Sequence, residues 1–439
     1  MRRLVCSGVL IAVALTAACG GGSQPAARKA PASAASAQPA AWTPTIEPVT
    51  LPVGPHSSEP RVSLSPNGLL VSWMEQEGKK ATLKFAERSA NGWSAARSAA
   101  SGTDWFISWA DVPSVMRMSN GTLVADWFRN TNIRQEGYDL WMSHSSDDGK
   151  TWAKPFTPHH EGTKTQHGFP SLFEMPDKSL GMVWLDAREY ELDKTDPEGG
   201  AVMLRYASFD PSWKQTADEM VNARVCECCQ TSAALTSDGM VVAFRDRSDK
   251  EIRDIHVTRL ENGRWTDPIL VHPDNWQIDS CPVNGPAISA RGRQLAVAWF
   301  TAAGGSQGQA FAAFSQDAGR TWGAPIRLDG GRSLGHVDIE MLDDGSAVAS
   351  YVEFADQRAR LKIRRVEPSG TASAPIEIAG GSGGRVSGYP RMARQGDDLL
   401  LAWTESAGSE PSGDDEDDAA PQQQQVKGAI AHVPHATAH

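Results

Sequence analysis

Tryptophan recurs at nearly regular intervals along this chain and marks a repeated unit. The recurring residues are Trp42, Trp93, Trp152, Trp213, Trp265 and Trp322, with gaps of 51 to 61 residues. Most of them stand in similar phrases, such as Thr-Trp-Ala-Lys-Pro and Thr-Trp-Gly-Ala-Pro. Self-similarity at a fixed period indicates a repeat architecture, in which each repeat is one supersecondary unit stacked on its neighbours.

Each repeat has the same internal order of short apolar runs. A first run is followed by a turn rich in Gly, Asp and Asn, and a second run then ends in an aromatic residue such as Trp184 or Trp299. An alternating third run follows, and the marker tryptophan opens the fourth. Short β-like runs between turn signals, without a convincing amphipathic helix, predict four-stranded antiparallel sheets. Four-stranded sheets repeated radially form a β-propeller, so the predicted fold class is all-β.

The number of first strands predicts seven blades. We place these strands near Pro60, Pro113, Pro170, Thr231, Pro286, Val337 and Pro390. The last repeat has no fourth strand of its own, whereas residues 42–51 form a spare one at the other end of the chain. If that strand completes the last blade, the ring closes between the termini and leaves no open sheet edge there. Six blades with an extra sheet is the alternative.

Two repeats contain a more specific motif between their third and fourth strands. The motif is Ser145, Asp147, Gly149 and Trp152 in one repeat, and Ser315, Asp317, Gly319 and Trp322 in the other. Both match the Asp-box, S-x-D-x-G-x-x-W, so the chain resembles the sialidase-like, Asp-box propeller superfamily over nearly all its length after residue 41. The aspartate is expected to secure the hairpin turn, the glycine to supply a positive φ, and the tryptophan to wedge between sheets. These turns are structural and say little about chemistry.

The amino terminus predicts export and a lipid anchor. Residues 1–18 have a basic start, a short apolar stretch and small residues before Cys19, as in a lipoprotein signal peptide. Cys19 is then the lipidated first residue of the mature protein, and residues 19–41 form a flexible tether. The alternative is an ordinary signal peptide with an incidental cysteine. We therefore expect attachment to the bacterial cell envelope through the lipid alone, with the propeller over residues 42–434 and a tail at 435–439.

The formal net charge of −11 is concentrated near the carboxyl terminus. Residues 405–425 combine a run of carboxylates with glutamines and predict a disordered loop in the last blade. The run lacks the glycine and the ligand spacing of an EF-hand loop, which argues against a Ca²⁺ site. No basic cluster indicates a nucleic-acid partner.

Candidate functional residues gather in the loops that lead into first strands and those that join second to third strands, because both sets meet on one propeller face. Blade 3 contributes His167, Asp186 and Arg188, blade 4 contributes Arg245, Asp246 and Arg247, and blade 5 contributes Asp279. The same sector holds Cys226, Cys228, Cys229 and Cys281. The predicted pocket therefore lies on the face formed by blades 3 to 5.

The four cysteines leave three interpretations open. In an oxidising compartment they form disulfides, for example one that bridges blades 4 and 5. Alternatively, their thiolates bind Cu(I) or Zn²⁺, with His167 and His272 as further candidate ligands. A redox-active pair is the third interpretation. No cofactor other than such a metal ion is expected.

The resemblance to sialidases implies a test of catalytic residues. Sialidases use three arginines to clamp the substrate carboxylate, an acid/base aspartate and a tyrosine nucleophile. The family's F/Y-R-I-P tetrapeptide is absent, and Arg61 and Arg391 follow a proline instead. These two arginines, with Asp186, Arg188, Arg245 and Asp246, remain the catalytic candidates, and Tyr190 or Tyr389 the candidate nucleophiles.

Our first hypothesis is accordingly a monomeric, non-catalytic propeller that binds a small molecule, a glycan or a metal ion on the face of blades 3 to 5. An exo-sialidase-type glycoside hydrolase at the same face is the alternative. A scaffold that docks another envelope protein is a third, weaker hypothesis.

Overall fold

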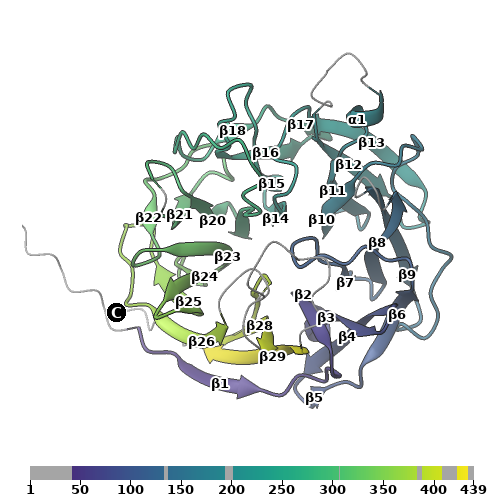
Figure 1. The fold of residues 1–439 in the computed structure, drawn as a ribbon, viewed down its shortest axis with the longest axis horizontal. Helices are drawn as coiled ribbons and strands as arrows, with labels where there is room; N and C mark the ends of the chain where they lie inside the picture. Colours follow the sequence, from purple (N-terminus) through teal and green to yellow (C-terminus); the bar gives the residue numbers. More distant parts are fainter. Residues whose placement is uncertain are drawn as a thin grey trace, which may run out of the picture. The chain divides into compact units, whose positions relative to one another are not determined.

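The computed structural model describes residues 42–132, 137–192, 201–305, 307–382, 388–407 and 423–433. Within these residues, seven antiparallel sheets follow one another around a ring (Figure 1). The predicted all-β, seven-bladed propeller is confirmed, and the six-bladed alternative is wrong. The described part of the chain contains one short helix, α1 (Glu189–Leu192), which follows the second strand of the third blade.

The first four blades take up the amino-terminal half of the ring. Blade 1 contains β2 (Ser57–Ser65), β3 (Gly68–Glu77), β4 (Lys80–Ser89), β5 (Gly92–Trp93) and β6 (Arg97–Gly102). Blade 2 contains β7 (Ser114–Arg117), β8 (Leu123–Asn132) and β9 (Gly137–Ser145), and a bridge from Met142 to Phe156 marks the place of its fourth strand. Blade 3 contains β10 (His167–Glu174), β11 (Leu180–Asp186), β12 (Met203–Phe209) and β13 (Gln215–Asn222). Blade 4 contains β14 (Ser232–Thr236), β15 (Gly239–Arg245), β16 (Ile255–Glu261), β17 (Arg264–Trp265) and β18 (Ile269–Leu270).

Three further blades complete the ring. Blade 5 contains β19 (Ala287–Arg291), β20 (Gln294–Thr301), β21 (Gln309–Ser315) and β22 (Ile326–Arg327). Blade 6 contains β23 (Ser333–Met341), β24 (Ala347–Ala355), β25 (Arg358–Val366) and β26 (Ile376–Ser382). Blade 7 contains β27 (Arg391–Gln395), β28 (Asp398–Ala407), β29 (Gln423–His432) and, as its outer strand, β1 (Thr45–Val49).

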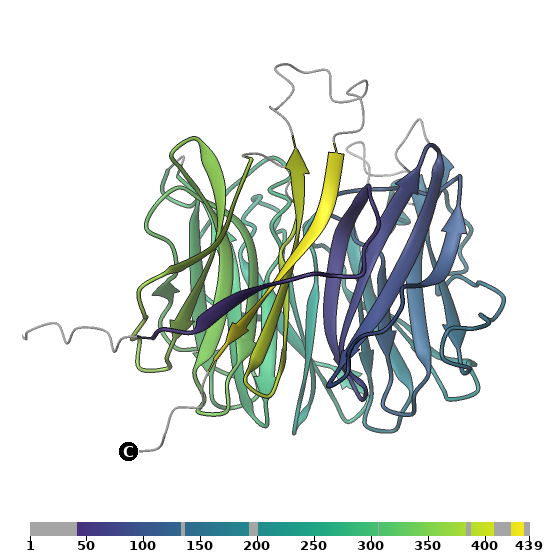
Figure 2. The same cartoon turned by 90° about the horizontal axis from the view of Figure 1, so that it is seen from below.

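The amino-terminal strand closes the ring, as the sequence predicts. β1 pairs antiparallel with β29 from Thr45 opposite His432 to Val49 opposite Gly428, and Figure 2 shows the two strands side by side. Blade 7 is also tied to blade 1, because Val426 donates its amide to Ser57 Oγ at 3.0 Å. The strand supplied from the other end of the chain therefore leaves β29 paired on both sides.

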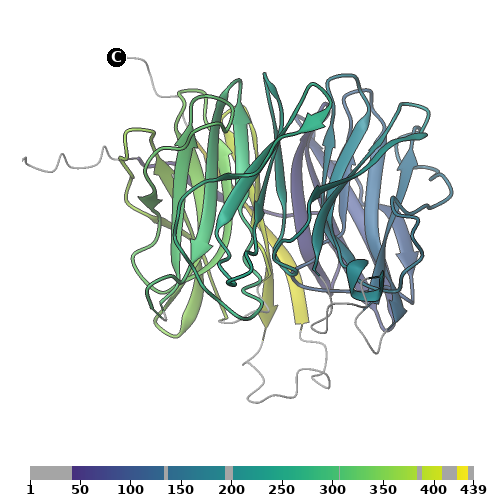
Figure 3. The ribbon, with the colours of Figure 1, turned by 90° about the horizontal axis from the view of Figure 1, so that it is seen from above.

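The second strand of each blade is apolar because neighbouring blades cover both of its faces. All seven residues of β11 are buried, as are seven of the eight residues of β20. In outer strands such as β13, exposed residues alternate with partly buried ones or follow one another. Viewed edge-on, the blades stand side by side with their strands running between the two faces (Figure 3). A strand covered on both sides reads as a continuous apolar run, which is the pattern that ends in Trp184 and Trp299.

One apolar cluster lies at each junction between blades, including the junction between blade 7 and blade 1. There Leu51 and Trp73 pack with Leu400 and Ile430. The core of this propeller is therefore distributed around the ring, and each blade is stabilised by burial against both neighbours.

The two Asp-box turns have the expected local structure. Ser145 Oγ donates to Asp147 Oδ1 at 2.8 Å and accepts the amide of Gly149 at 2.9 Å, where φ is 78°. Trp152 packs edge-on against Phe85 of blade 1, with ring centroids 6.2 Å apart. The second box repeats these bonds at Ser315, with Gly319 at a φ of 83°. Because the strands of a blade are antiparallel, these turns lie on the face opposite the loops that hold the candidate site.

Some sequence predictions concern residues outside the described ones, and the predicted bounds of one loop differ from those observed. The signal peptide, Cys19 and the tether over 19–41 lie outside them, as do residues 408–422 of the acidic loop and the tail at 435–439. The predicted loop of 405–425 is too wide, because β28 and β29 stay paired up to Ala407 opposite Gln423. Within the described part of the chain, no helix has the length and apolar character needed to span a membrane.

Candidate functional site

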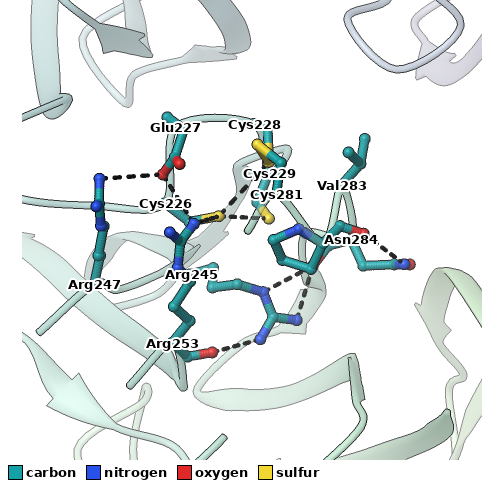
Figure 4. The surroundings of a disulfide bond; sticks show 12 residues. Cys226, Glu227, Cys228, Cys229, Arg245, Arg247, Arg253, Cys281, Val283 and Asn284 are labelled. Atoms are coloured by element: carbon teal, nitrogen blue, oxygen red, sulfur yellow. Dashed lines mark hydrogen bonds and ion pairs between the residues drawn. A yellow bond between two sulfur atoms is a disulfide. The ribbon is translucent and has the colours of Figure 1, made fainter. Parts of the chain in front are cut away.

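The four cysteines of the propeller meet where blade 4 adjoins blade 5. Cys226, Cys228 and Cys229 lie in the loop that leads into β14, and Cys281 lies in the loop that leads into β19. A disulfide joins Cys228 to Cys281, with Cα atoms 6.0 Å apart (Figure 4). The bond covalently links the leading loops of neighbouring blades, as one of the three interpretations of the sequence expects.

The remaining two cysteines are free thiols buried beneath the disulfide. Cys226 Sγ lies 2.9 Å from Cys229 Sγ, and both side chains are buried. The sulfur atoms of Cys226, Cys228 and Cys229 all lie within 4.8 Å of one another. Since Cys228 is already bonded to Cys281, two thiols are left that can bind a metal ion or be oxidised.

Two arginines bring positive charge to this thiol pair. Arg253 donates through Nη1 to Cys226 Sγ at 3.4 Å. Burial raises the pKa of Cys226, but the hydrogen bond with Cys229 and the charge of Arg245 outweigh it and lower that pKa to about 7. Burial and the neighbouring Cys226 raise the pKa of Cys229 instead. Of the two thiols, Cys226 is therefore the one that loses its proton more readily.

Arg245 holds the site together, because four of the five donors of its guanidinium are used by backbone carbonyl oxygens. Its guanidinium is buried, and it donates to the carbonyl oxygens of Asn284 at 2.8 and 3.0 Å, Arg253 at 2.6 Å and Phe300 at 2.7 Å. These bonds connect blade 4 to blade 5 below the cysteines. The predicted catalytic candidate is thus built into the framework.

The other charged candidates of blades 4 and 5 lie around the rim. Arg247 pairs with Glu251 at 2.9 Å and approaches Glu227 at 3.7 Å. Asp246 is half-buried, and burial raises its pKa. Asp279 is exposed. Tyr190, a candidate nucleophile on α1, has its pKa raised by burial and by the nearby Glu227.

His167, Asp186 and Arg188 belong to a separate cluster between blades 2 and 3. His167 begins β10 and faces Asp186 at the end of β11 in the strand register. Its Nε2 lies 2.7 Å from Glu161 Oε1 and 3.8 Å from Asp186 Oδ1. Arg188 pairs with Asp186 at 2.7 Å and with Glu161 at 3.2 Å.

Asp139 and His159 complete this second cluster, and sequence reasoning missed both of them as well as Glu161. The rings of His159 and His167 stack with centroids 3.8 Å apart, and Asp139 Oδ1 lies 3.6 to 3.8 Å from one nitrogen of each ring. Neighbouring carboxylates outweigh burial and raise the pKa of His167, whereas burial lowers the pKa of His159. The adjacent His159, His160 and Glu161 in a loop leading into a first strand were the available signal.

The histidines expected beside the cysteines lie elsewhere. His167 is in the second cluster, and His272 pairs with Asp274 at 2.7 Å. The thiol group among the described residues contains sulfur ligands alone. Neither candidate histidine therefore lies in the thiol group, because the separate loops of blades 3 and 5 carry them to other partners.

Arg61 and Arg391 meet at first strands of neighbouring blades. Both line a cavity of about 10 Å³ together with Asp111, Pro170 and Thr231. Burial and the charge of Arg391 lower the pKa of Arg61 to about 10. A space of this size holds about one water molecule, so the arginine pair has no room to clamp a sugar carboxylate here.

Tyr389, the other candidate nucleophile, is also committed to the framework. It is buried, stacks on Trp109 at 5.8 Å and donates its hydroxyl to the carbonyl oxygen of Val283. Burial and the neighbouring Cys229 raise its pKa. This tyrosine is therefore a buried framework residue and not an accessible nucleophile.

An open cavity of about 500 Å³ lies beside the second cluster. Its lining is polar and includes Thr131, Asp139, His159, His160 and Thr163. It is the larger of the two cavities described here, and a volume of this order accommodates a small ligand.

Comparisons with known proteins place the fold. No protein-family model matches the sequence, and no curated protein matches it. An ulvan lyase of polysaccharide lyase family PL25 superposes with a TM-score of 0.53 at 10% identity, over 86% of this chain and 95% of that one. The polysaccharide lyase Uly1 superposes with a TM-score of 0.49 at 11% identity, over 86% of this chain and 90% of that one. A mutant NanB sialidase from Streptococcus pneumoniae superposes with a TM-score of 0.44 at 8% identity, over 88% of this chain and 94% of that one.

At these identities the likeness shows the fold alone. The predicted propeller fold is confirmed at that level. Chemistry must be argued from the residues of this chain.

Proposed function

We propose that this protein is an exported, lipid-anchored propeller that binds Cu(I) through Cys226 and Cys229 without catalysing a reaction. The observation that carries the proposal is the pair of buried thiols with sulfur atoms 2.9 Å apart. The disulfide from Cys228 to Cys281 anchors the loop that presents them. A small shift of either side chain would allow one ion to bind between the two sulfurs.

The number of available thiols favours copper over zinc. Structural Zn²⁺ sites use four protein ligands in a tetrahedron. Here the disulfide removes two of the four cysteines, and the thiol group among the described residues includes no histidine. Cu(I) is a soft ion that prefers thiolates, and two of them suffice in a linear complex.

The charges around the thiols also favour this ion. A Cu(I) ion with two thiolates carries a net charge of about −1, which is costly to bury unless it is paired. Arg253 lies 3.4 Å from Cys226 Sγ, and Arg245 is buried nearby. Their positive charges offset the charge of the complex, and copper binding would release the proton of Cys229.

Anaerobic titration with Cu(I) against a chromogenic copper chelator tests the proposal. The wild-type protein should bind one equivalent, and Cys226→Ser and Cys229→Ser should each lose it. The double variant Cys228→Ser/Cys281→Ser removes the other two sulfurs and the anchor of the loop, so it should still bind one equivalent but with lower affinity. Equal binding by wild type and Cys226→Ser would contradict the proposal. So would a thiol titration of protein purified without reductant that finds Cys226 and Cys229 joined in a second disulfide.

Glycan binding or cleavage is the second candidate function. The open polar cavity of about 500 Å³ beside Asp139 and His159 favours it, and its volume suits a small saccharide. The propeller fold is also shared with an ulvan lyase. A panel of fluorogenic glycosides and a glycan array test this candidate. Turnover or binding that Thr163→Trp blocks would support it, and a negative result in both assays would exclude it.

A further inference from the structure

The second cluster described above combines metal-ligand chemistry with an open cavity. Asp139 lies near the start of β9 in blade 2, His159 in the link between blades, and His167 at the start of β10 in blade 3. One ligand atom from each of the three lies within 4.8 Å of the others. The cluster contains no cysteine and is separate from the thiol pair.

The ligand atoms lie close together, and two of the three have no hydrogen-bond partner among the described residues, whereas His167 Nδ1 also lies 3.3 Å from the carbonyl oxygen of Tyr138. Asp139 Oδ1 lies 3.8 Å from His159 Nε2 and 3.6 Å from His167 Nδ1. His159 is 5% exposed, yet its Nε2 makes no hydrogen bond with the described residues, and neither does Asp139 Oδ1. A buried polar atom without a partner is destabilising. This destabilisation is removed when an ion binds between these atoms.

We propose that Asp139, His159 and His167 bind a divalent first-row metal ion of the zinc type, with one coordination position open to the adjacent cavity. Two imidazoles and a carboxylate form a ligand set typical of Zn²⁺ sites that keep a position for water or substrate. Asp139 and His159 both line the cavity of about 500 Å³, so the open position faces solvent. The site can therefore hold an ion and a polar ligand together.

Glu161 acts on this site as an outer-shell residue. Its Oε1 lies 2.7 Å from His167 Nε2, the ring nitrogen opposite the one that faces Asp139. Metal-bound histidines commonly donate their other ring nitrogen to a carboxylate, which fixes the tautomer and makes the imidazole a stronger ligand. Arg188 in turn pairs with Glu161 at 3.2 Å and holds that carboxylate in place.

Binding requires one local rearrangement. The rings of His159 and His167 are parallel to within 4° and 3.8 Å apart, so their lone pairs do not yet converge on one point. An ion shared by both must tilt at least one ring. His159 is the ring that can move, because it comes from a loop, whereas His167 begins a strand.

Titration with Co²⁺ and Zn²⁺ tests this site in the full propeller. In the wild type, Co²⁺ bound to nitrogen and oxygen ligands should give visible d–d bands without a thiolate charge-transfer band, so binding here is distinguished from binding at the cysteines. The expected stoichiometry is one Co²⁺ per chain, displaced by one Zn²⁺. Failure to bind one stoichiometric Co²⁺ with this nitrogen and oxygen spectrum would overturn the proposal.

Substitutions assign the ligands. Asp139→Asn and His159→Gln should each weaken Zn²⁺ binding by at least about tenfold. His160→Gln is the matched control on the same loop, because His160 is exposed, lines the same cavity and bonds to Gln215 at 2.7 Å instead. Its affinity should remain that of the wild type. Equal losses in His159→Gln and His160→Gln, or wild-type affinity in Asp139→Asn, would show that these residues do not ligate the ion. Melting curves without metal confirm that each variant is folded.

Discussion

Cys226 Sγ lies 2.9 Å from Cys229 Sγ, while Cys228 between them in the sequence is bonded to Cys281 of the next blade. The loop thus divides three clustered cysteines between a structural bond and a free pair. The disulfide faces the surface, where Cys281 is exposed, and the thiols are buried beneath it. We therefore expect the disulfide to affect stability and the free pair to affect metal binding.

Removing the disulfide should destabilise the propeller. Cys228 and Cys281 are 53 residues apart, and a cross-link of that length restricts the unfolded chain enough to contribute about 2–4 kcal/mol. We expect Cys281→Ser and Cys228→Ser to lower the free energy of unfolding in urea by similar amounts. The double variant should lose no more than either single variant, because both remove the same bond. Unchanged stability in Cys281→Ser would show that the disulfide adds nothing.

Ring closure should depend on the amino-terminal strand. Leu51 is 6% exposed in the cluster between blades 7 and 1, and Leu51→Ala should cost about 2–4 kcal/mol of unfolding free energy. Leu64 is 59% exposed, so Leu64→Ala is the control and should change it by less than about 0.5 kcal/mol. Deleting residues 42–51 should lower the melting temperature strongly, whereas deleting 20–41 should not. Equal melting temperatures for the two deletions would argue against closure by β1.

Arg245 should behave as a framework residue. Arg245→Lys cannot satisfy the carbonyl oxygens of Asn284, Arg253 and Phe300 together, and each buried acceptor left unpaired costs about 1–3 kcal/mol. We therefore expect a loss of at least about 2 kcal/mol in thermal or urea unfolding. Arg247→Lys at the rim is the control and should cost less than about 1 kcal/mol. If Arg245→Lys were as stable as the wild type but lost ligand affinity, the side chain would belong to a binding site instead.

The Asp-box aspartates should make stability depend on acid. Hydrogen bonds from Thr151 and Ser145 lower the pKa of Asp147 to about 2. Although burial opposes it, bonds from Thr321 and Ser315 likewise lower the pKa of Asp317 to about 2. The unfolded value is about 3.9, so each carboxylate stabilises the fold fully above about pH 4 and loses that effect as the pH falls to about 2.

Melting temperature measured against pH checks this expectation. Asp147→Asn and Asp317→Asn should melt below the wild type at pH 7, and the difference should shrink as the pH falls from about 4 to 2. Asp279→Asn is the control, because Asp279 is exposed outside the boxes and its replacement should follow the wild-type curve. A difference that stays constant down to pH 2 would show that the effect does not come from the charge.

The proposed lipid anchor should determine where the protein resides. Residues 1–18 and Cys19 match a lipoprotein signal, so Cys19→Ala should move the protein from membranes to the soluble fraction of the envelope. The propeller of the released variant should melt as the wild type does. Retention of Cys19→Ala on membranes would point to another anchor.

The sequence alone determined the architecture, because each repeat can be recognised from short local sequence patterns. The second strands are continuous apolar runs, since both faces are covered, and the marker tryptophans and Asp-box turns set the period. The missing fourth strand of the last repeat and the spare strand before Leu51 together implied closure. Each strand and turn signal depends on residues close to one another in the chain, and closure follows from the number of strands at the two ends, so both can be recognised without the fold.

Only the tertiary structure decided how the site residues are grouped. Cys226, Cys228 and Cys229 are neighbours in the sequence but have different partners. The path of two loops decided which of their sulfur atoms bonds to Cys281. His159 and Asp139 joined His167 across the junction of two blades, where no sequence period relates them. Arg245 was an equally good clamp or framework residue by sequence, until burial placed three carbonyl oxygens around its guanidinium. Contacts between loops of different blades are set by packing of the whole ring, and local sequence does not encode them.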